Sequence, residues 1–113
     1  MNKRKLGGEW EQRACSYLSG QGYFILTTNY NCPLGEIDII ASEKDTVVFI
    51  EVKYRKTSAF GYAAEAVTPS KQRTIRKTAM YYLTEKLHST EVYCRFDVVC
   101  IDDDKITLIK DAF

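Results

Sequence analysis

Residues 35–53 read GEIDIIASEKDTVVFIEVK and contain two apolar runs, 37–41 and 47–52, on either side of a polar stretch. Short runs rich in β-branched residues that flank a few polar residues are typical of a β-hairpin. The pattern predicts two antiparallel strands joined by a turn centred on Lys44 and Asp45. In that register the numbers of two opposed residues sum to 89, as those of the two turn residues do.

Charged residues replace apolar ones at the open end of this hairpin. Ile40 would face Phe49, because residues two apart on a strand share a face and the register fixes their partners. Two residues further on, Asp38 would face Glu51, a carboxylate opposite a carboxylate. Like charges opposed across a ladder are destabilising, so keeping both ionised requires a cation, either Lys53 or a metal ion. The alternative is a solvent-exposed sheet end, but the neighbouring apolar pair favours a covered site.

Helical stripes and strand-like runs alternate along the rest of the sequence. Thr68 and Pro69 resemble the cap and first turn of a second helix. The order helix, three strands, helix, two strands predicts an α/β fold with a mixed sheet of about five strands and helices packed on it. The elements expected outside the hairpin are a helix at 8–20, a strand at 22–30, a helix from 68, and strands at 92–101 and 106–109.

The chain of 113 residues has the length of one domain, 1–113, with a core of its own. It contains no apolar run as long as a membrane span, and its N-terminus lacks the apolar centre of a signal peptide. We therefore expect a cytoplasmic protein that does not associate with membranes.

Cysteine spacing gives no indication of a zinc site, because the sequence has no Cys-x-x-Cys motif and His88 is its one histidine. Cys94 and Cys100 have the same strand parity as Phe96 and Val98, so we expect both to be buried free thiols.

Charge is distributed unevenly along the chain. Residues 14–52 carry five acidic residues and one basic residue, whereas residues 53–77 carry seven basic residues and one acidic residue. This arrangement suits a polyanion held beside metal-binding carboxylates, although charge runs are usually only solvated faces. An aromatic segment at 60–62 either stacks on bases or packs on the protein. The candidate nucleic-acid contacts are Arg55, Lys56, Lys71, Arg73, Arg76 and Lys77.

Two polar residues on the predicted helices are further candidates. Glu11 lies at the edge of the apolar stripe of the first helix, where it either reaches towards the sheet or is an ordinary surface glutamate. Gln72 lies on the face of the second helix that carries its apolar residues, so it is either a satisfied buried amide or a polar residue of the site. That apolar face consists of Ile75, Ala79, Tyr82 and Leu83.

The hairpin places Asp38 across from the sequence Glu51-x-Lys53. Two carboxylates can hold Mg²⁺, which keeps several waters and also binds substrate phosphate. A metal ion activates water and screens charge on phosphate, and a lysine on the same face can orient or deprotonate that water. The motif therefore indicates phosphodiester hydrolysis.

This arrangement resembles the PD-(D/E)xK nuclease superfamily, which has the restriction-endonuclease-like fold. More closely, the sequence is similar to the YraN family of small bacterial proteins, which is related to archaeal Holliday-junction resolvases. The similarity covers nearly the whole chain. The matching stretches are Gly7, Glu11-x-x-Ala14-x-x-Tyr17-Leu18, Gly22-Tyr23, Asn29, 35–38, 48–53, Lys71, 95–99 and 112–113.

The resemblance implies a Mg²⁺- or Mn²⁺-dependent nuclease that acts on DNA, including branched or recombining DNA, and that forms a homodimer. It implies that Asp38 and Glu51 bind the metal, that Lys53 is the catalytic lysine, and that Glu11 and Gln72 join the site. The family usually has glycine before the helix glutamate, where this chain has Trp10. Two other functions remain open: a nucleic-acid-binding protein of the same fold without catalysis, and an interaction domain that docks through the C-terminal strand or Phe113.

Overall fold

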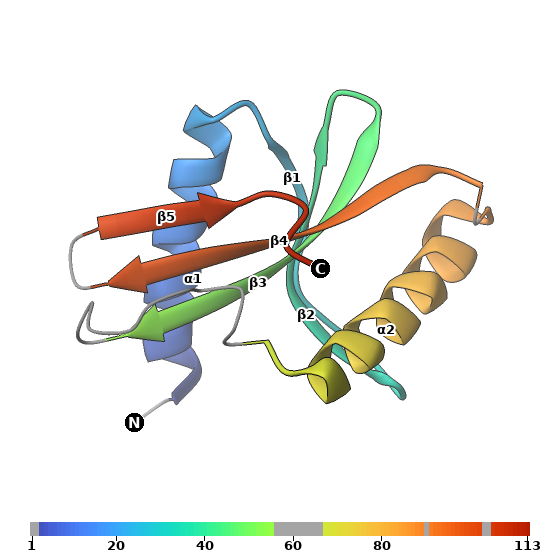
Figure 1. The fold of residues 1–113 in the computed structure, drawn as a ribbon, viewed down its shortest axis with the longest axis horizontal. Coiled ribbons are helices and arrows are strands. Elements are labelled where there is room, and N and C mark those ends of the chain that lie inside the picture. Colours follow the sequence, from blue (N-terminus) through green and yellow to red (C-terminus); the bar gives the residue numbers. More distant parts are fainter. Residues whose placement is uncertain (1–2, 56–66, 90, 103–104) are drawn as a thin grey trace.

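The computed structural model describes residues 3–55, 67–89, 91–102 and 105–113, with only the backbone described at residues 3–7 and 55 (Figure 1). The predicted order of helix, three strands, helix and two strands is confirmed. The elements are α1 (Lys3–Gly20), β1 (Phe24–Cys32), β2 (Gly35–Glu43), β3 (Thr46–Arg55), α2 (Pro69–Leu87), β4 (Tyr93–Asp102) and β5 (Lys105–Ile109).

The five strands form one mixed sheet in the order β1-β2-β3-β4-β5. Only the central pair, β3 and β4, is parallel, and the other neighbours are antiparallel. A parallel pair needs a crossover connection, and α2 lies in that connection. The two helices cover opposite faces of the sheet, as Figure 1 shows, and each face carries its own cluster of buried apolar side chains. The predicted mixed sheet is therefore confirmed.

The second helix begins as its sequence predicts. Thr68 is the N-cap, and its hydroxyl accepts a hydrogen bond from the backbone N–H of Lys71 at 3.1 Å. Pro69 follows at the first helical position, where its missing N–H costs no hydrogen bond. The predicted apolar face is confirmed as the buried face of α2, consisting of Ile75, Ala79, Tyr82 and Leu83.

The first helix starts at Lys3, five residues earlier than its apolar stripe predicts. Ala14 and Leu18 are fully buried against the sheet face opposite α2. The ring of Trp10 stacks on that of Tyr54, with 3.9 Å between the ring centroids and 15° between their planes. This contact ties the N-terminal half of α1 to the end of β3, because the two aromatic residues come from those elements.

The prediction that Cys94 and Cys100 are both buried is half right. Cys100 is buried, whereas Cys94 is exposed because it is the second residue of β4, whose first two residues are exposed. Strand parity alone therefore does not decide burial at a strand end. None of the four cysteines is in a disulfide bond.

Gly35, at the start of β2, lies directly under α2. A Cβ atom at this position would lie 2.7 Å from Cγ2 of Thr74 and 2.9 Å from Oγ1 of Thr78. Thr78 has little freedom to move, because it is fully buried and its hydroxyl donates a hydrogen bond to the Thr74 carbonyl. Gly35 therefore allows α2 to approach the start of β2 closely.

We expect Gly35→Ala to lower the free energy of unfolding by about 1–3 kcal/mol, the usual cost of overpacking. Urea unfolding curves of the two proteins measure this difference. Gly8→Ala is the matched control, because a Cβ there meets no atom within 4 Å. A Gly35→Ala protein as stable as the control would contradict the close approach.

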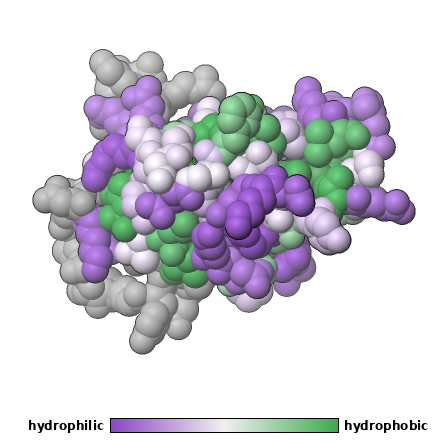
Figure 2. Space-filling view, turned by 90° about the horizontal axis from the view of Figure 1, so that it is seen from above, coloured by the Kyte–Doolittle hydropathy of each residue, from purple (hydrophilic) through white to green (hydrophobic). Residues whose placement is uncertain are grey.

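Within the described residues, no helix is long and apolar enough to cross a membrane. Figure 2 views the molecule from above the orientation of Figure 1, and on this face hydrophilic and hydrophobic residues are interspersed. Two of the exposed apolar side chains are Phe24 of β1 and Tyr93 of β4, at 69% and 77% exposure. Each is among the first residues of its strand.

Candidate functional site

The sheet forks where β2 and β3 separate, beyond the paired residues Ile39 and Ile50. Their antiparallel pairing runs from Glu43↔Thr46 to Ile39↔Ile50 and follows the predicted register. Beyond that point β3 continues alongside β4, and β2 continues alongside β1. Asp38 is therefore the next residue of β2 at the fork.

Asp38 binds β3 through its side chain where the backbone ladder stops. One of its carboxylate oxygens, Oδ2, accepts a hydrogen bond from the backbone N–H of Val52 at 2.8 Å. The carboxylate thus satisfies a donor that a neighbouring strand would otherwise satisfy. Asp38 also lies close enough to Glu51 to raise the pKa of that group, so the structure brings the two predicted carboxylates together.

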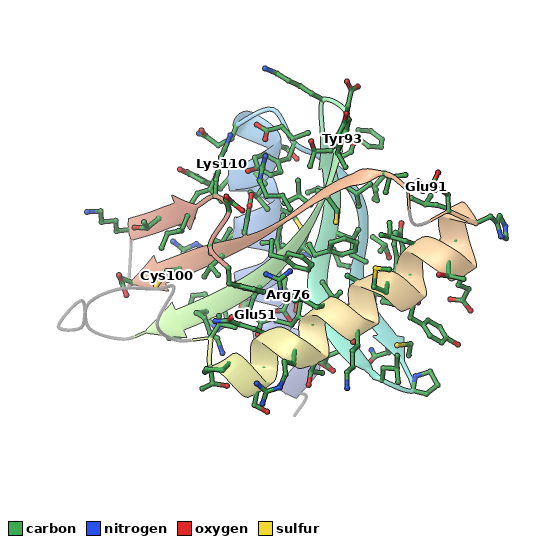
Figure 3. All side chains as sticks on the ribbon, turned by 45° about the vertical axis from the view of Figure 1, so that its right-hand side comes forward. Glu51, Arg76, Glu91, Tyr93, Cys100 and Lys110 are labelled. Atoms are coloured by element: carbon green, nitrogen blue, oxygen red, sulfur yellow. The ribbon has the colours of Figure 1, made fainter. Side chains whose placement is uncertain are left out.

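Glu51 is only 6% exposed, and Figure 3 shows it on β3 near the N-terminal half of α2. Two ammonium groups lie near its Oε2 atom: Nζ of Lys71 at 3.4 Å and Nζ of Lys53 at 3.8 Å. The pKa of Glu51 is raised to about 7, mainly by burial and then by the Asp38 carboxylate, although Lys71 and Lys53 both act to lower it. The two lysines therefore reduce, but do not remove, the cost of ionising Glu51.

Lys71 was predicted to contact phosphate, and no sequence pattern placed it beside Glu51. It lies in the first turn of α2, and the packing of that helix on the sheet brings its ammonium group closer to Glu51 than that of Lys53. Both lysine side chains remain partly exposed, at 42% and 31% respectively. They can therefore contact a ligand from solvent as well as Glu51.

The two helix candidates have partners outside the carboxylate pair. The Gln72 amide donates a hydrogen bond to the Val67 carbonyl at 2.9 Å, which ties the start of α2 to the preceding segment. One Glu11 oxygen, Oε1, accepts a hydrogen bond from the Asn29 amide at 2.7 Å. Roles for Gln72 in catalysis and for Glu11 in metal binding stay predictions.

The predicted nucleic-acid contacts differ in their surroundings. Arg73 and Lys77 are exposed on α2. Arg76 is also exposed, and its guanidinium carbon lies 4.7 Å from the ring centre of Phe96. Arg55 ends β3, but its side chain is outside the described part of the structure, as are Lys56 and the aromatic segment at 60–62.

The donor set suits a hard divalent cation bound through two carboxylates and water. Within the described residues, no group of three or more His, Cys, Asp or Glu side chains is arranged to hold a metal. Mg²⁺ does not need such a group, because it keeps several waters and binds through one or two carboxylates plus substrate phosphate. Asp38 and Glu51 supply two such carboxylates. The Asp38 carboxylate disfavours ionisation of Glu51, and a bound cation would offset this effect.

Fold and site together define a mixed α/β protein with a pair of carboxylates at the fork of its sheet and two lysines beside them. The chain belongs to Uncharacterised protein family UPF0102, whose family model matches residues 10–101. Membership of this family is the part of the sequence resemblance that the comparisons confirm.

Relatives match the chain over almost its whole length. A UPF0102 protein of Lachnoclostridium phytofermentans is 50% identical over 113 residues, which cover 100% of this chain and 96% of the relative. A UPF0102 protein of Caldicellulosiruptor saccharolyticus is 44% identical over 119 residues and covers 100% of both chains. A UPF0102 protein of Coxiella burnetii is 44% identical over 110 residues, which cover 96% of this chain and 92% of the relative.

Proposed function

We propose that this protein is a Mg²⁺- or Mn²⁺-dependent nuclease of the PD-(D/E)xK superfamily that hydrolyses DNA phosphodiester bonds, including those of branched DNA. One observation carries the proposal: Asp38 and Glu51 meet at the fork of the sheet, with Lys53 and Lys71 on the Glu51 carboxylate. Two adjacent carboxylates, one of them buried, lower the stability of a fold, and such arrangements concentrate at functional sites.

Asp38 and Glu51 would hold the metal ion. When bound, the ion would activate a water molecule and screen the charge that develops on the phosphate. Asp38 is held in position for this role, because the Val52 N–H fixes one of its oxygens. Glu51 is held by burial and by two lysines.

Lys53 would act on the attacking water. It follows Glu51 by two residues on the same strand, so the two side chains project from the same face. Its ammonium group lies 3.8 Å from Glu51 and is partly exposed, so it can orient a water between the protein and an incoming phosphate. Lys71 would bind a non-bridging phosphate oxygen from the side of α2.

Exposed basic residues of α2 would bind the DNA backbone next to this point. Arg73 and Lys77 extend the positive charge of Lys71 along the helix. Contacts of this kind are independent of base sequence and weaken with added salt. They suit a substrate that is recognised through its backbone.

The test is cleavage of labelled duplex, single-stranded and four-way-junction DNA in Mg²⁺ or Mn²⁺ by wild type, Asp38→Asn and Lys53→Ala. Asparagine keeps an oxygen for the Val52 N–H but removes the charge, so we expect the fold to persist. We expect each variant to lose cleavage by about 100-fold, since each removes a metal ligand or the residue that handles water.

Matched controls are Asp45→Asn and Lys105→Ala, which remove the same charges from exposed positions in the β2–β3 turn and on β5. Both should cleave as wild type does. Equal cleavage by wild type, Asp38→Asn and Lys53→Ala would overturn the assignment.

The exposed basic face of α2 also supports a second candidate, a nucleic-acid-binding protein without catalysis. This protein would bind DNA in a salt-dependent manner, equally well in wild type and Asp38→Asn, and would cleave with neither metal. Binding titrations at two salt concentrations, run beside the cleavage assay, separate the two functions.

A further inference from the structure

Asn29 has a left-handed backbone conformation in the middle of a β-strand, with φ at 52°. Asparagine tolerates this conformation better than most residues, but a strand does not normally contain it. The pairing of β1 with β2 passes from Thr28↔Ile39 to Tyr30↔Ile37. Asn29 therefore lies opposite Asp38, at an interruption of the ladder.

At the same interruption, the side chains of β2 exchange the faces of the sheet to which they point. In a regular strand Ile37 and Ile39 would share one face, because side chains alternate. Here Ile37 joins Ile40 in the core on the α2 side, while Ile39 packs in the core on the α1 side. Asp38 lies at the point of reversal, and its carboxylate reaches across to the Val52 N–H of β3.

The side chain of Asn29 has a separate contact. Its amide donates to Oε1 of Glu11 at 2.7 Å, a short hydrogen bond to a charged acceptor. Asn29 is exposed and Glu11 is half-buried. A hollow of about 200 Å³ opens beside the pair, so solvent reaches it; its lining residues are Gly8, Glu11, Gln12, Cys15, Thr28 and Asn29.

We propose that Asn29 is a positioning residue of the candidate site: from a left-handed backbone position opposite Asp38, its amide holds the Glu11 carboxylate towards that residue. The inference rests on the proposed function, because it concerns cation binding at the same site. In that orientation Glu11 would add negative charge beside a bound cation and would accept hydrogen bonds from its water molecules.

Two features of the contact favour this role over simple stabilisation. An exposed hydrogen bond adds little to stability, because both of its groups can bond to water instead. A left-handed non-glycine residue inside a strand costs about as much, and such residues cluster at functional sites. The Asn29 conformation and its Glu11 contact therefore bring little net stability, and the residue that combines them lies opposite Asp38.

The test is the affinity for Mn²⁺, measured by calorimetry, together with urea unfolding, for wild type, Asn29→Gly and Glu11→Gln. Glycine keeps the left-handed backbone and removes only the amide. We expect Asn29→Gly and Glu11→Gln each to weaken Mn²⁺ binding by about tenfold. This is the lower end of the range of losses seen when a residue that orients a metal ligand or its water is removed. The double variant should be no weaker than either single one, since both remove the same effect.

Lys44→Gly is the matched control, because Lys44 has a similar left-handed conformation, with φ at 56°, in the β2–β3 turn away from the fork. It should bind Mn²⁺ as wild type does. If Asp38→Asn loses Mn²⁺ binding while Asn29→Gly keeps it, the positioning role is wrong and the proposed function stands. If Asp38→Asn binds Mn²⁺ as tightly as wild type, the proposed function fails and this inference with it.

Discussion

Asp97→Ala is expected to lower the free energy of unfolding by about 3–5 kcal/mol, the cost of removing one partner from a buried ion pair. Asp97 is fully buried on β4. Arg95 donates two hydrogen bonds to its carboxylate, from Nε at 2.8 Å and from Nη2 at 2.9 Å. The Tyr23 hydroxyl and the Asp111 N–H donate to the same carboxylate at 2.8 and 2.9 Å. Four donors would lose their acceptor at once.

Urea unfolding measures this effect, and Asp45→Ala, an exposed carboxylate of the β2–β3 turn, is the control. Tyr23→Phe provides a milder variant in case Asp97→Ala does not fold. It removes one hydrogen bond to the carboxylate and should cost about 1–2 kcal/mol. If both variants were as stable as the control, the hydrogen bonds to the Asp97 carboxylate would add nothing to the free energy of unfolding.

Glu51→Gln is expected to stabilise the protein at pH 8 by on the order of 3 kcal/mol and to have almost no effect near pH 4. Burial, followed by the Asp38 carboxylate, raises the pKa of Glu51 to about 7 from the model-peptide value of 4.5. Between these values the folded protein binds a proton that the unfolded chain does not bind. Wild-type stability must therefore fall as the pH rises from about 4.5 to about 7.

Glutamine has nearly the same shape and no charge, so the variant lacks this component of the pH dependence. Unfolding in urea at several pH values from 4 to 8.5 measures the difference. Under the proposed function, added Mg²⁺ should stabilise wild type at pH 8 but not Glu51→Gln, because the ion would bind the folded carboxylate pair. Glu9→Gln, at an exposed position of α1, is the control. If the free energy of unfolding changed with pH in the same way for wild type and Glu51→Gln, the raised pKa of Glu51 would be excluded.

The sequence predicted what depends on local periodicity. Alternation and a polar turn determine the hairpin register, and this register correctly placed Asp38 within reach of Glu51. Helical spacing and the Thr68 cap likewise predicted the buried face and the start of α2. These features need only neighbours in the chain, so one sequence is enough to reveal them.

Features that depend on distant segments could not be predicted. Asn29 occurs in a β-rich stretch, and nothing local shows that its backbone is left-handed or that Glu11 accepts its amide. The contact of Lys71 with Glu51 requires the packing of α2 on the sheet. Asp97 is an acidic residue in an apolar strand, and two of its partners, Tyr23 and Asp111, are distant from it in the sequence.

The parallel pairing of β3 with β4 also has an electrostatic consequence. It obliges the chain to cross over through α2, and the Lys71–Glu51 contact shows that the helix enters with its first turn beside the site. The unpaired N–H groups of a first helical turn carry about half a positive charge through the helix dipole. A phosphate bound by Lys71 would therefore also meet the positive end of that dipole, because the parallel pairing places the start of α2 beside the fork.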